Sequence, residues 1–418
     1  MKKILTLLAA FGTMFYLSSC GDDDGGNPNP DTGENVLKGY IEEDMTLTND
    51  KIWEISGRVF VTNEATLTIM PGTIIKGQSG QGSNASVLTI ARDGFIEAAG
   101  TASNPIIFTT VDDNIKVGEK MGTNLEVTDN QLWGGVVILG SAPISPDAGT
   151  TAQIEGVPGS ETLGQYGGDD AADDQGTFKY VSIRHGGTTI DPTAGNDING
   201  LTLGGVGTGT EISNIEVIAN FDDGIEFFGG TVNVSNILIY GVGDDALDVD
   251  QAYAGTISNF AIYTSTATAS DEGLEIDGPE GSENSEGEFT IKDGTITSVD
   301  GGGSAADFKS KPQGTVSNVK WTGFEGGSKI QIRASFDADN ECADKTDAYT
   351  TLNADKLVFT SVEFASFTVY DGDDEDDCDV PSDYNTTAGL KLSSSVTTGV
   401  TSTSVWNGWS LSANLDLL

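Results

Sequence analysis

The sequence has little of what several classes of protein require. Its 418 residues include three cysteines, one histidine, and 20 lysines or arginines against 64 acids, for a formal charge of −44. Three cysteines are too few for a zinc cluster or a disulfide-dense scaffold, and His185 alone excludes any mechanism that needs two imidazoles. A charge this negative, with no local cluster of bases, repels phosphate backbones. The composition therefore excludes nucleic-acid binding.

Long apolar runs are scarce as well, and the clearest one lies at the N-terminus. Lys2 and Lys3 precede the apolar residues 4–17, a run too short to span a bilayer but suited to a signal peptide. The run ends in Leu-Ser-Ser-Cys20, which resembles a bacterial lipobox, whose cysteine is acylated, with palmitate for example, and becomes the mature N-terminus. We expect residues 1–20 to be a lipoprotein signal peptide and Cys20 to carry the lipid. An ordinary secretory signal is the alternative.

The residues after Cys20 concern the location of the protein. The acidic run 21–24 resembles the signal that sends lipoproteins of Bacteroidota to the outer face of the outer membrane, with a solvated spacer as the alternative. Residues 21–35 contain two prolines and no apolar periodicity, which is typical of a flexible tether. We expect an outer-membrane protein that is lipid-anchored through Cys20 and faces the cell exterior.

Helical periodicity is missing too, whereas short strand patterns are frequent. No window of a dozen residues holds a 3.6-residue apolar stripe, so helix should be nearly absent. Short β-branched runs bounded by turn residues, such as 65–69, 87–90 and 135–139, predict strands. Since 37% of the residues are hydrophobic, the chain can still bury a sizeable core.

Two elements repeat through the middle of the chain. An aliphatic-Ser-Asn motif recurs at 212–215, 234–237, 257–260 and 316–319, and an acidic motif at 222–226, 244–248 and 271–275. A period of about 20–25 residues with short strands predicts one coil of a solenoid. At one corner of every coil, asparagines would adopt a tight turn and bond to those above and below. The expected ladder consists of Asn214, Asn236, Asn259, Asp293 and Asn318.

The coil length, the Ser-Asn corners and the glycine-rich turns resemble right-handed parallel β-helices of the pectate-lyase-like superfamily. With segments 65–77, 96–109 and 133–140 they also resemble a group of Bacteroidota surface lipoproteins without an assigned activity. We expect an all-β chain that forms a single-stranded right-handed parallel β-helix with coils of about 22–24 residues. It should span residues 36–418, with strands ending near residue 368 and an acidic cap at about 337–418.

Two cysteines remain once Cys20 is lipidated. Cys342 and Cys378 lie in acidic, turn-rich stretches of a chain expected outside the cytoplasm. In such an oxidising compartment, we expect them to form a disulfide bond that stabilises the cap.

An acidic face is the main candidate for a site. Strand alternation directs Asp248 and Asp250 outward, and adjacent coils add further carboxylates about 4.8 Å away. Their repulsion requires a bound cation, raised pKa values or full solvation, and Ca²⁺ is the cation that carboxylate oxygens suit best. The candidate calcium ligands are Glu226, Asp248, Asp250, Glu275 and Asp277.

Cations follow these carboxylates when the next two coils are aligned on Phe308 and Ile330. Carboxylates followed by bases resemble polysaccharide lyases on this fold, in which lysine or arginine removes a proton. This resemblance makes Arg333, Lys309 and Lys311 candidate catalytic bases, although no local lyase signature surrounds them and the polygalacturonase pattern is not met.

Two further predictions concern single side chains. His185 is expected at a turn or on the surface. Five aromatic residues would either stack on sugars or pack within the core and between loops; they are Trp133, Tyr166, Phe227, Phe228 and Tyr253.

Together these features favour a non-enzymatic cell-surface lipoprotein, a monomer whose acidic β-helix face binds an extracellular glycan or protein. A calcium-dependent polysaccharide lyase or glycoside hydrolase is the first alternative. A structural surface-layer protein or adhesin is the second.

Overall fold

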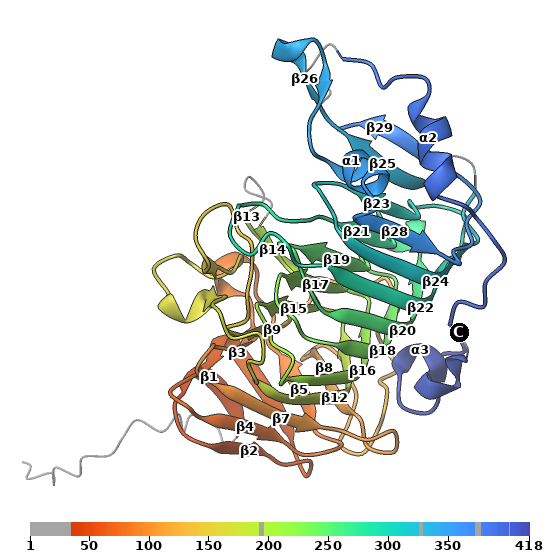
Figure 1. Ribbon diagram of the computed structural model, residues 1–418. Coiled ribbons are helices and arrows are strands. Elements are labelled where there is room, and N and C mark those ends of the chain that lie inside the picture. The colour runs from red at the N-terminus through yellow and green to blue at the C-terminus, as the bar shows by residue number, and fades with distance from the viewer. Residues whose placement is uncertain (1–34, 192–195, 326–328, 373–377, 401) are drawn as a thin grey trace, which may run out of the picture.

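The structure is a computed structural model that describes residues 35–418 apart from 192–195, 326–328, 373–377 and 401. The expected signal peptide, Cys20 and residues 21–34 of the expected tether lie outside the described residues. Twenty-three strands join one continuous sheet through parallel pairings. The sheet winds into a right-handed parallel β-helix, with β2 (Met45–Leu47) near one end and β29 (Phe367–Asp371) near the other (Figure 1). The predicted fold is confirmed.

Each coil has three faces. The first face stacks these strands: β1 (Val36–Ile41), β3 (Ile52–Val61), β6 (Val87–Ile90), β9 (Val136–Leu139), β15 (Leu201–Gly204), β17 (Ile225–Phe228), β19 (Leu247–Asp250), β21 (Leu274–Ile276), β23 (Ala306–Phe308), β25 (Ile330–Ala334) and β29.

The second and third faces share several long strands that bend at the corner between them. The second face starts with β2, β4 (Thr66–Ile69) and β7 (Phe95–Ala99) and ends with β28 (Leu357–Thr360), and the third includes β5 (Ile74–Gly77) and β8 (Ile106–Thr110). The shared strands are β12 (Gly176–Arg184), β16 (Glu211–Ile218), β18 (Val234–Tyr240), β20 (Thr256–Thr264), β22 (Phe289–Ser298) and β24 (Gly314–Thr322).

Small elements decorate the coils. Three antiparallel pairs are β10 (Ala152–Gln153) with β11 (Gln165–Tyr166), β13 (Thr188–Asp191) with β14 (Asn196–Ile198), and β26 (Phe336–Asp337) with β27 (Ala343–Asp344). The helices are α1 (Ala348–Asn353), α2 (Tyr384–Lys391) and α3 (Leu411–Asn414), with short 3-10 turns at Gly82–Asn84, Thr162–Gly164, Thr266–Thr268, Ala338–Asn340 and Thr403–Trp406. Among the described helices, none has the length and apolar character needed to cross a bilayer.

The core is a stack of inward side chains. Phe227 pairs with Val249 and Val249 with Ile276, and all three are fully buried. Burying a side chain of this size contributes about 1.5–3 kcal/mol. Because the stack continues through all coils, each coil depends on its neighbours for burial.

An asparagine ladder occupies the corner between the second and third faces. All five expected members have φ between 52° and 59°, the left-handed region that asparagine and aspartate tolerate. The Nδ2 of Asn236 donates to Asn214 Oδ1 at 3.2 Å, and the Nδ2 of Asn259 donates to Asn236 Oδ1 at 2.6 Å. Asn318 donates likewise to Asp293, at 2.8 Å. The ladder therefore fixes the backbone at this corner.

The region after β25 contains the predicted disulfide bond. Cys342 and Cys378 are bonded, with their Cα atoms 5.7 Å apart, so this prediction is confirmed. Beyond α2 the chain runs back along the helix, and α3 lies beside β16 and β18 (Figure 1). There the backbone amides of Leu411 and Ser412 donate to the buried carboxylate of Glu216, at 2.7 and 2.8 Å.

His185 takes the turn conformation that was expected, with φ of 59°, but it does not lie on the surface. The loop between β8 and β9 covers it, and its Nδ1 lies 2.6 Å from the carbonyl oxygen of Asp129. Burial lowers the pKa of His185. Of the two expected positions, a turn or the surface, the turn is therefore the one observed, and a loop remote from its strand encloses the imidazole.

Candidate functional site

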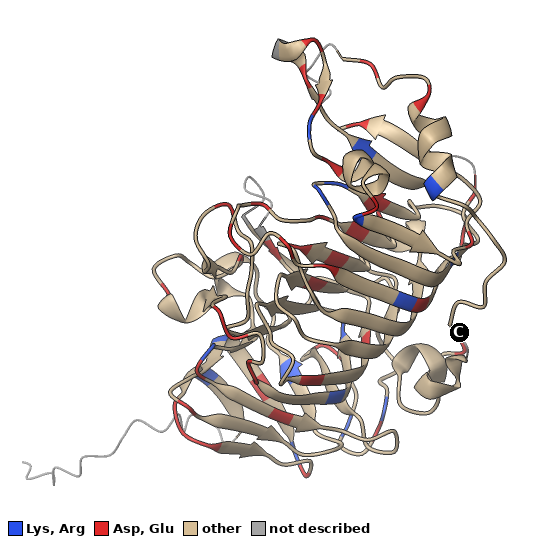
Figure 2. Ribbon diagram, viewed as in Figure 1, with Lys and Arg blue, Asp and Glu red and all other residues tan. Residues whose placement is uncertain are grey.

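One outward column of side chains runs along the whole first face. Its middle is acidic, because Glu226 pairs with Asp248 and Asp248 with Glu275. In order, the column contains Tyr40, Phe60, Thr89, Val137, Thr202, Glu226, Asp248, Glu275, Asp307, Gln331 and Thr368. Figure 2 shows the acids as successive red bands on β17, β19 and β21.

A second column lies two residues further along each strand. It contains Asp250 and Asp277, and Lys309 and Arg333 continue it. The alignment of the coils on Phe308 predicts Lys309 in the first column, directly after Glu275. This is wrong by two residues, because Phe308 pairs with Ile276 rather than with Leu274, and Lys309 therefore lies in the second column. Ala306 occupies the inward position that Leu247 and Leu274 occupy in earlier coils. Because alanine is small, the apolar pattern of this coil was aligned on Phe308 instead. The residue that follows Glu275 in the first column is Asp307.

Acidic pairs stack at the turn that leads into the first face. Asp223 Oδ1 accepts from the amide of Asp245 at 2.9 Å, and Asp245 Oδ1 accepts from the amide of Glu272 at 2.8 Å. These carboxylates connect consecutive coils. They were recognised in the sequence as a repeat but were not among the predicted ligands.

Carboxylates from the turn and from the first column meet in three neighbouring groups. Within each of three groups, oxygens lie within 4.8 Å of one another: Asp222, Asp223 and Asp244; Asp223, Glu226 and Asp248; Asp245, Glu272 and Glu275. We use "carboxylate cluster" for these residues together with Asp250 and Asp277. Of the five predicted calcium ligands, Glu226, Asp248 and Glu275 belong to these groups, whereas Asp250 and Asp277 lie outside them in the second column.

Two loop residues close over the carboxylate cluster. Asn199 donates from Nδ2 to Glu226, and Glu155, from the loop between β10 and β11, also bonds to Glu226. Glu226 is consequently buried. The sequence had no signal for either contact. Glu155 comes from the long connection between β9 and β12, and Asn199 comes from the turn that leads into β15, one coil before β17.

Burial dominates the electrostatics of the carboxylate cluster. It raises the pKa of Asp222 and of Glu155 to about 8, with repulsion from nearby carboxylates adding to the effect. Burial and neighbouring carboxylates likewise raise the pKa of Glu272 to about 8 and that of Asp244 to about 6. For the same reasons the pKa lies well above its usual range for Asp223, Glu226, Asp245, Asp248 and Asp250. Without a cation, the cluster therefore retains protons near neutral pH.

Two buried acceptor atoms at the cluster have no hydrogen-bond donor. They are Asp248 Oδ1 and Asn199 Oδ1, and Asn199 is 0% exposed. An unsatisfied buried acceptor is costly. Carboxylate and amide oxygens in this arrangement fit the ligand preference of Ca²⁺, so the residues present suit such an ion.

The three candidate bases separate in the structure. Lys309 forms an ion pair with Glu275. Burial opposes its charge, but Glu275, Asp277 and Asp307 together outweigh burial, so the pKa of Lys309 is raised. Arg333 pairs with Asp347 at 3.0 Å. Burial opposes its charge too, but Asp347 together with Asp277 outweighs burial, so the pKa of Arg333 is raised. Both side chains are therefore held as cations.

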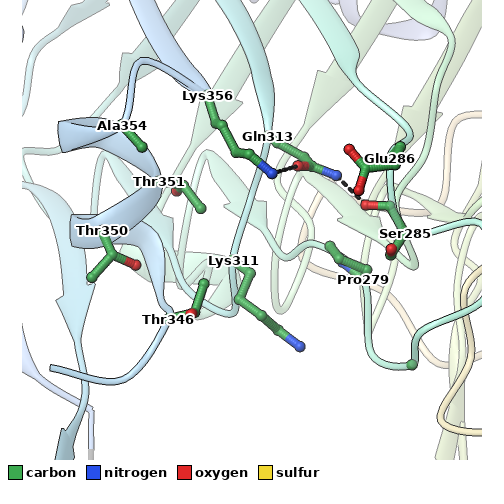
Figure 3. A pocket seen from close by; sticks show the side chains of 11 residues that line it. Pro279, Ser285, Glu286, Lys311, Gln313, Thr346, Thr350, Thr351, Ala354 and Lys356 are labelled. Carbon is green, nitrogen blue, oxygen red and sulfur yellow. Dashed lines mark hydrogen bonds between the residues drawn. The ribbon is translucent and has the colours of Figure 1, made fainter.

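Lys311 lines a groove of about 410 Å³ between α1 and the loop 279–286 (Figure 3). Lys356 enters the same groove and donates to Gln313 Oε1 at 3.4 Å, while Gln313 donates to the carbonyl of Ser285. The backbone amide next to Lys311, that of Ser310, donates to Asp277 at 2.6 Å. The groove thus adjoins the carboxylate cluster.

The five predicted aromatic residues are all buried: Trp133, Tyr166, Phe227, Phe228 and Tyr253. Phe228 packs against Tyr166 with ring centroids 5.9 Å apart, beneath the loop that follows β9. Of the two possibilities for these residues, packing in the core and between loops is therefore the one observed.

A family model described as a pectate-lyase-like β-helix domain matches residues 39–410. Comparison with curated proteins and with solved structures gave no significant match. The match covers nearly all coils, including the carboxylate cluster and the chain that returns along the helix. The chain therefore belongs to the pectate-lyase-like β-helix domain family.

Proposed function

We propose that this β-helix is a non-enzymatic cell-surface binding protein whose carboxylate cluster holds a divalent cation, calcium. The observation that carries the proposal is the imbalance of charge within the cluster. Ten carboxylates lie together, and within the described residues Lys309 is the ammonium that forms an ion pair with one of them. Either protons or a cation must compensate the remaining charge.

The strongest ligand set is the group of Asp223, Glu226 and Asp248. Asp248 Oδ1 and the amide oxygen of Asn199 are the unpartnered acceptors beside it. Ca²⁺ accepts six to eight oxygens in flexible geometry, whereas Mg²⁺ demands a near-ideal octahedron and dehydrates reluctantly. Several carboxylates in an irregular cluster therefore favour calcium.

Calcium in the carboxylate cluster would fix the surface that binds a partner. Glu155 and Asn199 reach the cluster from loops, so a cation would attach those loops to β17. On the other side, Asp277 connects the cluster to the groove that Lys311 and Lys356 line (Figure 3). We propose this groove as the place where an extracellular glycan or protein with anionic groups binds, because Lys311 and Lys356 bring two ammonium groups to it against the one carboxylate of Glu286.

The cellular location is part of the proposal and rests on the sequence. The lipobox at Cys20 and the acidic run after it support an outer-membrane lipoprotein that faces the exterior. Cys20→Ala should abolish lipid labelling and membrane retention without a change in melting temperature. A variant that still fractionates with membranes after a salt wash would contradict this anchor.

No observation favours the lyase or hydrolase alternatives. A lyase base has to be unprotonated, whereas Lys309 and Arg333 are held as cations by Glu275 and Asp347. A hydrolase needs access for a sugar ring to its carboxylates, but Asp223 and Glu226 are buried.

Thermal unfolding tests the cation. Calcium that binds only the folded chain raises stability by about 2.7 kcal/mol at one hundred times its dissociation constant. The control is sodium chloride at matched ionic strength, since screening of repulsion also stabilises. We expect calcium to exceed sodium, and Asp248→Asn with Asp250→Asn to remove the excess.

The matched control variant is Glu97→Gln with Glu211→Gln. It removes the same charge from exposed positions on the second face and should keep the calcium effect. Equal shifts with calcium and sodium in the unmodified chain would overturn the proposed cation site.

A further inference from the structure

A second groove lies at the N-terminal end of the first face. It has a volume of about 370 Å³, within the range of small-ligand sites. Tyr40, Arg58, Phe60 and Glu161 line it. Tyr40 is five strands before Glu226 in the first column, or about 24 Å at the spacing of parallel strands. This groove is therefore separate from the carboxylate cluster.

Its chemistry differs from that of the rest of the face. Tyr40 is 51% exposed, although large aromatic side chains are otherwise mostly covered. Its ring stacks beside that of Phe60, with centroids 5.9 Å apart and planes inclined by 25°. Together the two rings form an aromatic platform that begins in the groove wall and continues into the apolar cluster between the first face and the loops that cover it.

Hydrogen-bonding groups surround the edge of this platform. The Tyr40 hydroxyl donates to Glu161 Oε2 at 2.8 Å, and the amide of Leu163 donates to Glu161 Oε1 at 3.1 Å, so the carboxylate is held in place. Arg58 donates from one terminal nitrogen to the carbonyl of Gly156, while its Nε is buried without an acceptor. One carboxylate and one guanidinium leave the groove without excess charge.

We propose that this groove binds a ring of a neutral saccharide. A pyranose ring has an apolar C–H face, which matches an exposed aromatic ring, and hydroxyls around its rim that both donate and accept. Glu161 supplies acceptors and Arg58 supplies donors at the edge of the platform. An anionic sugar would place its charge beside Glu161, which disfavours it. The inference does not depend on calcium.

Isothermal titration of the full chain in the presence of EDTA tests the proposal. The probes are neutral hexasaccharides of β-1,4-glucan, β-1,3-glucan, α-1,4-glucan, β-1,4-mannan and β-1,4-xylan. We expect at least one to bind, and Tyr40→Ala to weaken that binding about tenfold or more. Tyr40→Phe keeps the ring and should weaken binding less.

Phe95→Ala is the matched control, because Phe95 is also an exposed aromatic residue, at 36%, but lies on the second face outside the groove. It should leave binding unchanged. The proposal is overturned if none of the saccharides binds, or if Tyr40→Ala and Phe95→Ala have equal effects on binding. A parallel titration with calcium and without EDTA completes the test: a saccharide that binds only there would overturn the proposal and would assign the saccharide to the carboxylate cluster instead.

Discussion

Asn236 combines two properties that its position in the coil requires. Its φ of 59° is in the left-handed region, and its side chain both donates to Asn214 and accepts from Asn259. For most L-residues this conformation costs about 1–2 kcal/mol, and each hydrogen bond contributes about 0.5–1.5 kcal/mol. Conformation and bonding can therefore be separated by substitution.

Asn236→Ala should destabilise the protein by about 2–4 kcal/mol, since it loses the bonds and strains the turn. Asn236→Gly should cost less, because glycine adopts positive φ without strain. Chemical denaturation of the two variants measures the difference. Equal losses would show that strain is unimportant at this corner.

Single residues also show how far the sequence could predict the site. Alternation correctly directs Asp248 and Asp250 outward, because strand geometry fixes the period of two. Asp307 was missed because the small inward Ala306 hid the register of its coil. The contact of Glu155 could not be predicted, since it depends on how a long loop folds back over the sheet, and that of Asn199 comes from a turn outside the repeated motifs.

At the scale of the element, the C-terminal helix α3 is held by one buried carboxylate. Glu216 accepts from the amides of Leu411 and Ser412, from the Ser412 hydroxyl at 2.7 Å, and from Ser182. Glu216→Ala would leave buried donors without acceptors, each costing about 1–3 kcal/mol. We expect a loss of about 3 kcal/mol or more, and faster hydrogen exchange in residues 402–414.

Glu211→Ala is the control on the same strand. Its side chain is 61% exposed and pairs with Lys179, and exposed pairs contribute about 0–1 kcal/mol. A similar loss of stability in both variants, or unchanged exchange in Glu216→Ala, would argue against the role of Glu216 in holding α3.

Elements were easier to predict than their decoration. The repeated motifs predicted the coils and the corner ladder, because both follow from a period. The small number of cysteines predicted the disulfide partners. The return of the chain to β16 carries no periodic signal. It depends on Trp406 and Trp409, which pack on strands far earlier in the chain.

For the whole molecule, the carboxylate cluster predicts an unusual dependence on pH. The pKa of Asp222, Glu155 and Glu272 is about 8 in the folded chain, against about 4 in an unfolded chain. Between these values the folded state binds more protons, so stability falls as pH rises. In EDTA, the melting temperature should therefore decrease between about pH 5 and pH 8.

Calcium should reverse this trend, because a cation binds carboxylates only after they lose their protons. The excess stabilisation by calcium should grow as pH rises over the same range. A melting temperature in EDTA that stays constant or rises would mean that the carboxylates are ionised in the folded chain without penalty.

The most direct test of the calcium site is a calorimetric titration of the EDTA-treated full chain with calcium chloride near neutral pH. We predict saturable binding of at least one calcium ion per chain, lost in Asp248→Asn with Asp250→Asn and retained in Glu97→Gln with Glu211→Gln. Heat that does not exceed dilution, or binding that the Asp248→Asn with Asp250→Asn variant retains, would contradict a cation at the carboxylate cluster.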